Sequence, residues 1–226
     1  MNKSERVSLS AADGHHLSAY LARPSGSPLG GVVVLQEIFG VNSETRHVAD
    51  DFAAAGYLAI APAMFDRTER DVELDYTQME RGLALANSIA DAALVHDLQA
   101  AVDAVSSAGP VAAIGYCWGG ALAYVAACQC TSIAAAACFY GTRIVRYCDS
   151  MRPKVPVQYH FGALDKSLPA EAIAKIKAAD PAGELHLYDG ADHAFTNRER
   201  PNFHAVAARL AHERCLQFLS RSHAHE

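Results

Sequence analysis

The chain has 226 residues, of which 51% are hydrophobic and 19% charged, with a formal net charge of -6 and an isoelectric point near 6.0. This composition provides enough apolar residues for a large core and excludes a disordered or fibrous chain. Lysine and arginine are scattered instead of gathered in a basic patch, so we expect no nucleic-acid partner. The length fits a single α/β domain over residues 1–226.

Residues 1–13 contain no basic segment followed by an apolar one, so we expect no secretory signal and a cytoplasmic location. The longest apolar runs, such as 31–35 and 133–139, are far shorter than the roughly 20 residues that cross a bilayer, so no membrane partner is expected. The six cysteines lie mostly in apolar runs without paired CxxC motifs, which is typical of reduced, buried thiols. The sequence leaves open whether the protein is a monomer or a small homo-oligomer.

Short apolar runs alternate with alanine-rich stretches of helical period, which predicts an α/β fold with a mostly parallel central sheet and helices on both faces. About seven to eight strands are expected, beginning with an antiparallel hairpin around Asp13-Gly14, a pair that favours turns. The predicted strands are 7–9, 17–22, 32–35, 58–61, 111–114, 133–139, 155–161 and 185–188. The last six contain no Asp, Glu, Lys or Arg, and only His160 and His186 among them are titratable histidines, so we expect them to be buried.

Apolar residues spaced by three and four predict helices that join the strands as right-handed crossovers. These helices are expected at 45–55, 83–106, 119–128, 169–179 and 203–220. The segment 64–81 is richer in charge and follows the end of a strand, where open α/β sheets bind ligands, so it is a candidate active-site loop. The tail 222–226 is expected to fray.

The sharpest local signal is Gly115-Tyr116-Cys117-Trp118-Gly119-Gly120, which lies between an apolar strand and a helix-like stretch. In a strand-to-helix elbow, glycines two positions either side of the nucleophile allow the neighbouring backbones to approach. The amides and positive dipole end of the following helix favour a thiolate and an adjacent oxyanion. Cys117 is therefore the candidate nucleophile. The alternative is that Cys117 is one more small buried residue.

A thiolate nucleophile needs a base, and the base needs an orienting carboxylate. Asp165 and His193 follow Cys117 in the order nucleophile, acid, histidine that α/β-hydrolases use. Both lie in loops that leave successive predicted strands, so both should reach one edge of the sheet. Of the eleven histidines, only His193 combines a loop, a strand end and this order. Asp192 is expected to point elsewhere, and the alternative for Asp165 is a surface turn or helix-cap carboxylate.

Glu37 directly follows the apolar run 31–35 and Gln36, which would place its carboxylate near the sheet edge with poor solvation. Burial would raise its pKa and make it a competent proton acceptor or donor. The alternative is an ordinary exposed turn glutamate.

These motifs, together with Gln36-Glu37-Ile38-Phe39-Gly40, the loop 162–165 and Gly190-Ala191-Asp192-His193-Ala194-Phe195, are similar to those of the dienelactone hydrolase family over nearly the whole chain. The resemblance implies a triad of Cys117, His193 and Asp165 that opens a cyclic enol-lactone such as a dienelactone to maleylacetate. It also implies that Glu37 helps to generate the thiolate when substrate binds. The oxyanion hole would consist of the backbone N–H groups of Ile38 and Trp118.

The family resemblance also points to residues that hold the substrate carboxylate. In the best-known members two arginines bind this group, and Arg67 matches the first of them. At the second position the chain has Asn197, followed by Arg198, so either Arg198 turns inward or the substrate preference differs. Tyr76 and Trp118 are candidates for apolar walls of the site.

The leading hypothesis is a hydrolase that opens a small, carboxylate-bearing lactone or ester through a thioester acyl-enzyme. A second hypothesis, motivated by Asn197, is an esterase or thioesterase of the same fold that acts on a different small carbonyl substrate. A third is a noncatalytic binding protein with this scaffold. No organic cofactor and no metal are expected, because the tail residues His223 and His225 do not form a closed ligand set.

Overall fold

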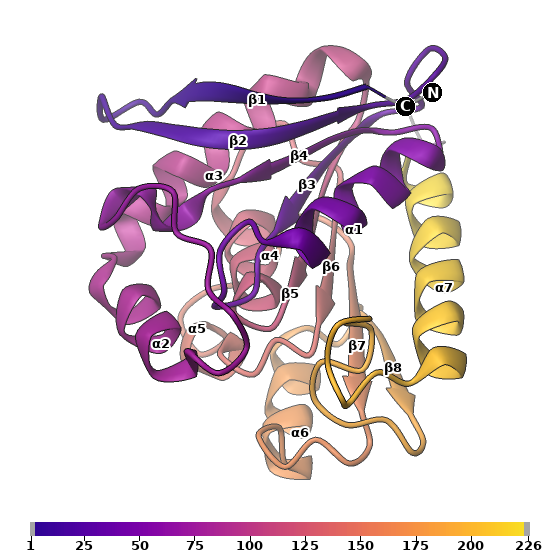
Figure 1. Ribbon diagram of the computed structural model, residues 1–226. Coiled ribbons are helices and arrows are strands. Elements are labelled where there is room, and N and C mark those ends of the chain that lie inside the picture. Colours follow the sequence, from indigo (N-terminus) through magenta and orange to yellow (C-terminus); the bar gives the residue numbers. More distant parts are fainter. Residues whose placement is uncertain (1–2, 224–226) are drawn as a thin grey trace.

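The computed structural model describes residues 3–223, without the side chain of His223, and contains an eight-stranded sheet with helices on both faces (Figure 1). The strands are β1 (Lys3–Ser10), β2 (His16–Arg23), β3 (Gly31–Leu35), β4 (Leu58–Pro62), β5 (Val111–Tyr116), β6 (Ala135–Phe139), β7 (Val157–Gly162) and β8 (Glu184–Tyr188). The helices are α1 (Ser43–Ala54), α2 (Met79–Ser88), α3 (Asp91–Val105), α4 (Trp118–Gln129), α5 (Ile144–Tyr147), α6 (Ala170–Ala179) and α7 (Ala205–His223), with short 3-10 helices η1 (Met64–Arg67) and η2 (Ser106–Ala108).

The strand order is β1-β2-β4-β3-β5-β6-β7-β8, and every pair from β4 to β8 is parallel. Strand β2 is antiparallel to both β1 and β4, so the predicted N-terminal hairpin is confirmed. This is the α/β-hydrolase fold expected from the sequence. The carboxyl ends of the six parallel strands lie at the same edge of the sheet, which is where ligands bind in such folds.

Strand β3 shows why the sheet is covered on both faces. Val33 and Leu35 belong to one hydrophobic core together with residues of α3 and α4, whereas Val32 and Val34 belong to a second core with residues of α1 and α7. All five residues of the strand are buried. Because successive side chains of a strand point to opposite faces, a strand buried on both faces is a continuous apolar run, and this run made the strand predictable.

The structure corrects the helix predicted over residues 83–106, which consists of two helices, α2 and α3. The chain is extended at Ile89, the C-cap residue of α2, and at Ala90, the N-cap residue of α3. The hydroxyl of Ser88 donates to the carbonyl oxygen of Leu85 at 2.7 Å, a side-chain bond of the kind that competes with helix continuation. The short helix α5 was not predicted.

Two further expectations change at the end of the chain. Strand β8 is only partly buried, with Leu187 49% exposed, because it is the edge strand and pairs only with β7. Of the tail expected to fray, residues 222 and 223 belong to α7, and residues 224–226, including His225, lie outside the described residues. Within residues 3–223, no helix combines the length and the apolar character needed to cross a bilayer.

Helix α2 lies unusually close to the loop that follows β3. A Cβ atom at Gly82 would overlap with the carbonyl oxygen of Ile38 in that loop. The helix backbone therefore reaches the loop only because residue 82 has no side chain.

This contact predicts that Gly82→Ala destabilises the protein. The added methyl group should lower the free energy of unfolding by about 1–3 kcal/mol through overpacking, although alanine in a free helix is favoured over glycine by about 1 kcal/mol. Chemical denaturation measures the change. The matched control is Ala84→Gly at an exposed position of the same helix. It should lower the free energy of unfolding only by the difference in helix propensity between the two residues. A more stable Gly82→Ala variant would contradict the contact.

Candidate active site

Cys117 occupies a sharp turn between β5 and α4, as the glycine pattern predicted. Its backbone has φ 53° and ψ −114°, a conformation that residues other than glycine rarely adopt. A Cβ at Gly115 would overlap with the carbonyl oxygen of Gly119, and a Cβ at Gly119 would overlap with that of Leu35. The N–H of Cys117 donates to the carbonyl oxygen of Phe139 at 3.0 Å. The turn is thus held by close backbone contacts on two sides.

The loops after β7 and β8 bring Asp165 and His193 together. Nδ1 of His193 lies 2.7 Å from Oδ2 of Asp165. A carboxylate only accepts, so Nδ1 donates and Nε2 is left for another partner. The N–H of Ser167 donates to Asp165 at 2.9 Å, and the Ser167 hydroxyl contacts both residues. Asp192 accepts from the backbone N–H of His193 at 2.7 Å and does not compete for the ring.

Opposite pKa shifts make Asp165 and His193 an ion pair. Burial raises the pKa of Asp165, but hydrogen bonds from His193 and Ser167 outweigh burial and lower it. Burial lowers the pKa of His193, but its contacts with Asp165 and with the thiol of Cys117 raise it to about 10. The contribution of His193 is complete below its ordinary pKa of 6.5 and is lost as pH rises toward 10, whereas that of Asp165 is complete above its ordinary pKa of 3.8 and is lost as pH falls below it.

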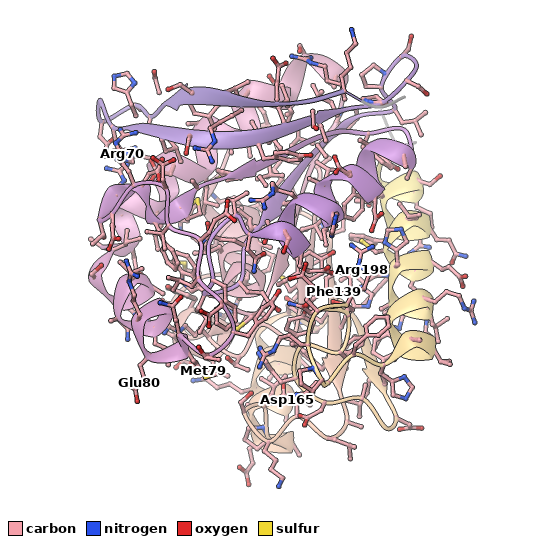
Figure 2. The ribbon with its side chains drawn as sticks, viewed as in Figure 1. Arg70, Met79, Glu80, Phe139, Asp165 and Arg198 are labelled. Atoms are coloured by element: carbon pink, nitrogen blue, oxygen red, sulfur yellow. The ribbon has the colours of Figure 1, made fainter. Side chains whose placement is uncertain are left out.

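Cys117, Asp165 and His193 line one cavity of about 450 Å³. Figure 2 shows Asp165 and Met79, which contribute to its walls, in the lower part of the molecule. The other lining residues are Ile38, Phe39, Leu83, Thr142, Lys166, Ser167, Asp192 and Arg200. The cavity is therefore built at the carboxyl ends of the parallel strands, with helix α2 as one wall.

The walls of the cavity differ in character. Met79 and Leu83, one turn apart in α2, are 42% and 38% exposed and form an apolar side. Lys166 and Arg200 add positive charge. Asp165 and Asp192 add negative charge, so the lining combines an apolar side with charges of both signs.

Arg200 is the functional candidate that the sequence reasoning missed. Its guanidinium lies over the rings of Phe39 and Tyr76, at 5.7 and 5.6 Å from their centroids. Its buried Nε has no hydrogen-bond partner among the described residues. The run Arg198-Glu199-Arg200 contains two arginines, so the sequence did offer Arg200 as a candidate. Arg198 was preferred because it lies nearer to the position of the family's second carboxylate-binding arginine.

Arg67, expected to bind the substrate carboxylate, is not among the residues that line this cavity. Its guanidinium donates to both carboxylate oxygens of Asp97 at 2.8 Å and to Asp13 at 2.6 Å. The Asp97 side chain is fully buried, so it requires a charged partner. Arg67 is held by this buried acid and serves the fold.

Asn197, Arg198 and Tyr76 also lie outside the cavity lining. Arg198 turns toward α1, where its Nε lies 3.2 Å from both carboxylate oxygens of Glu44. Asn197 is 3% exposed and donates to Oε2 of Glu37 at 3.0 Å. Its amide also donates to the Tyr76 hydroxyl at 3.2 Å. Asn197 and Arg198 are thus each hydrogen-bonded to a glutamate, and Tyr76 contacts both Asn197 and Arg200.

Glu37 is 6% exposed, and burial raises its pKa against the charges of Arg200 and His193 and the hydrogen bond from Asn197. The buried location and the direction of the shift agree with the sequence-based expectation. Its action on the thiol stays a prediction.

The two backbone groups expected to bind an oxyanion are free to do so. Between residues 3 and 223, neither the N–H of Ile38 nor that of Trp118, the first residue of α4, has a hydrogen-bond acceptor. The Trp118 side chain stacks on Phe65 with centroids 5.2 Å apart. It packs in the core and is not a wall of the cavity.

One group of potential metal ligands converges in the described part of the chain. Ligand atoms of Glu44, His47 and Glu199 lie within 4.8 Å of one another. Glu44 is already bonded to Arg198, and the other two residues are exposed. This cluster lies outside the cavity that contains Cys117.

Comparison with known proteins agrees with this geometry. The model of the dienelactone hydrolase family matches residues 17–223. The chain belongs to the dienelactone hydrolase family. It is a hydrolase. Carboxymethylenebutenolidases of Pseudomonas putida and of Pseudomonas sp. strain P51 are 32% and 34% identical to it; each alignment covers 96% of this chain, and 96% and 95% of the relatives.

Solved structures show the same fold. A Klebsiella pneumoniae protein, provisionally described as a dienelactone hydrolase, superposes with a TM-score of 0.85 at 27% identity, covering 97% of this chain and 99% of that one. A dienelactone hydrolase-like promiscuous phosphotriesterase from metagenomic libraries gives 0.78 at 21% identity, covering 96% and 98%. At that lower identity the likeness concerns the fold alone.

The ion pair predicts the effect of Asp165→Asn on His193. Without the carboxylate, the pKa of His193 should fall from about 10 toward its ordinary value of 6.5. Burial disfavours the charged ring, and Asp165 no longer stabilises it. NMR titration of the labelled imidazole measures the shift. His212, whose pKa burial lowers, is the internal control and should not change. An unaltered His193 titration would contradict the ion pair.

Proposed function

We propose that this hydrolase cleaves a small carboxylic ester or lactone through a thioester on Cys117. The observation that supports this most is the joint placement of Cys117 at a strained elbow and of His193, bonded to Asp165, in one cavity. A thiol beside an imidazolium and at a helix N-terminus favours the thiolate. The names of the Pseudomonas relatives agree with an enol-lactone as substrate.

In the proposed reaction, the thiolate attacks the carbonyl carbon and the carbonyl electrons move to oxygen. The resulting oxyanion accepts hydrogen bonds from the N–H groups of Ile38 and Trp118. When the carbonyl re-forms, the ester oxygen leaves and takes a proton from His193. His193 then removes a proton from water, which attacks the thioester and releases the thiolate. Asp165 keeps the ring oriented throughout.

Glu37 is the proposed acceptor of the proton of the resting thiol. Burial raises its pKa, which makes the carboxylate a stronger proton acceptor. Asn197 donates to one of its oxygens, which limits the orientation of the carboxyl group.

We further propose that the substrate carries a carboxylate and that Arg200 binds it. The guanidinium lines the cavity, and its Nε has no partner in the region described. The charge on Lys166 favours the same anion. This assignment replaces Arg67 and Arg198, both of which are already paired with acids.

Replacing Cys117 tests the nucleophile. Cys117→Ala should lower kcat/KM for dienelactone and for short activated esters by roughly 10³-fold or more, as for other triad members. When the unsubstituted protein is mixed with substrate and quenched with acid, mass spectrometry should find the acyl group on the peptide that contains Cys117. Cys148→Ala, at a buried thiol outside the cavity, is the control. Unchanged turnover of Cys117→Ala would refute the mechanism.

A pair of arginine variants tests the substrate class. Arg200→Gln should lower kcat/KM for a carboxylate-bearing lactone by about 10- to 150-fold, the value of a charge-assisted hydrogen bond of 1.5–3 kcal/mol. It should leave a neutral methyl ester nearly unaffected. Arg198→Gln is the matched control and should not change this preference. If both substrates respond equally to Arg200→Gln, an esterase or thioesterase acting on a different carbonyl compound is the better interpretation.

A further inference from the structure

Glu37 lines a second, smaller cavity and is absent from the lining of the cavity that contains Cys117. The smaller cavity has about 20 Å³ of space for the centre of a water molecule. A buried water needs roughly 10–15 Å³ by this measure, together with two to four polar partners. Polar side chains are available in the wall from Asn42, Thr45, Tyr140, Thr196 and Asn197. Size and chemistry therefore both fit one water molecule.

The carboxyl group of Glu37 lacks one hydrogen bond. Oε2 accepts from Asn197, but the buried Oε1 has no partner among residues 3–223. An unsatisfied buried polar atom costs about 1–3 kcal/mol. The residue is only 6% exposed, so a water in the smaller cavity would be a suitable partner for this oxygen.

The smaller cavity adjoins a larger one that opens between α1 and α7. The larger cavity has about 240 Å³, and Glu44, Val48, Tyr116 and Thr196 line both. Arg198, which also lines the larger cavity, is labelled between these two helices in Figure 2. Only side chains of the shared wall therefore separate Glu37 from the surface on this face of the sheet.

Tyr140 lines the smaller cavity with Glu37, where its hydroxyl lowers the pKa of the Glu37 carboxyl group, and it also contacts His193. Its ring is 1% exposed and meets the His193 ring edge-on, with centroids 5.1 Å apart. Its hydroxyl is 2.8 Å from Oγ1 of Thr196. The charged groups that act on Glu37 are Arg200 and His193, and the titratable Glu44 shares its cavity.

We propose that the smaller cavity holds a water molecule through which Glu37 exchanges its proton with solvent by way of the cavity between α1 and α7. The chemical use of this route rests on the proposed function. The S–H bond of Cys117 breaks, an O–H bond forms on Glu37, and the proton then passes to the water and to solvent. This transfer leaves a carboxylate and proceeds while substrate fills the cavity at Cys117.

Infrared spectroscopy of the intact protein tests the route. Cys117 is first alkylated with iodoacetamide to obstruct the substrate cavity, and the protein is transferred to D₂O at a pH where Glu37 is protonated. The C=O band of the Glu37 acid, assigned by its loss in Glu37→Gln, shifts when the proton exchanges. Val48→Phe fills the shared wall and should slow this shift by about tenfold or more, because exchange then requires local opening.

Val206→Phe is the matched control, since Val206 is 63% exposed on α7 and lines neither cavity. In this variant the proton of Glu37 should exchange at the same rate as in the unsubstituted protein. Equal exchange in Val48→Phe and the unsubstituted protein overturns the proposal, as does equal slowing by both variants.

A crystal structure of the unsubstituted protein decides the matter if Val48→Phe fails to fold. It should show a water within hydrogen-bonding distance of the Glu37 carboxyl group, and an empty cavity overturns the proposal. Neither readout depends on turnover. An active Cys117→Ala variant would therefore refute the proposed function and leave the exchange result standing.

Discussion

The close contact between the start of α4 and the end of β3 sets the position of the Cys117 turn relative to the loop after β3. The backbone of Gly119 lies against the carbonyl oxygen of Leu35, where no Cβ fits. The same contact fixes Cys117, two residues before Gly119, relative to the loop that carries Glu37 and Ile38. The backbone of Cys117 is therefore positioned relative to the N–H of Ile38 by close backbone packing.

Low solvation acts on three titratable groups of this region with different results. Asp165 has a lowered pKa because His193 and Ser167 donate to it, and His193 has a raised one because it contacts Asp165 and Cys117. Glu37, with one oxygen unpartnered, has a raised pKa. Burial disfavours the charged form of each group, so the shift follows burial at Glu37 and follows the partners at Asp165 and His193, where they outweigh burial.

Much of the fold and the proximity of Cys117, Asp165 and His193 were predictable because local patterns encode them. Apolar runs mark strands buried on both faces, and strand ends place the loops at one edge. The directions of the arginine side chains were not predictable. Arg67 is directed by Asp97, thirty residues away, and Arg198 by Glu44 on α1, and neither partnership leaves a local signal. The exposure of β8 likewise depends on strand order, which no short pattern contains.

Helix α2 forms a wall of the cavity and contains none of the groups proposed to react. Met79 and Leu83 project from it with much of their surface exposed, and its backbone at Gly82 lies against the loop at Ile38. Recognition of the apolar part of a substrate is therefore encoded separately from bond cleavage. Natural selection can alter this helix residue by residue and change which compounds the protein accepts, while the sulfur, the imidazole and their geometry are inherited intact.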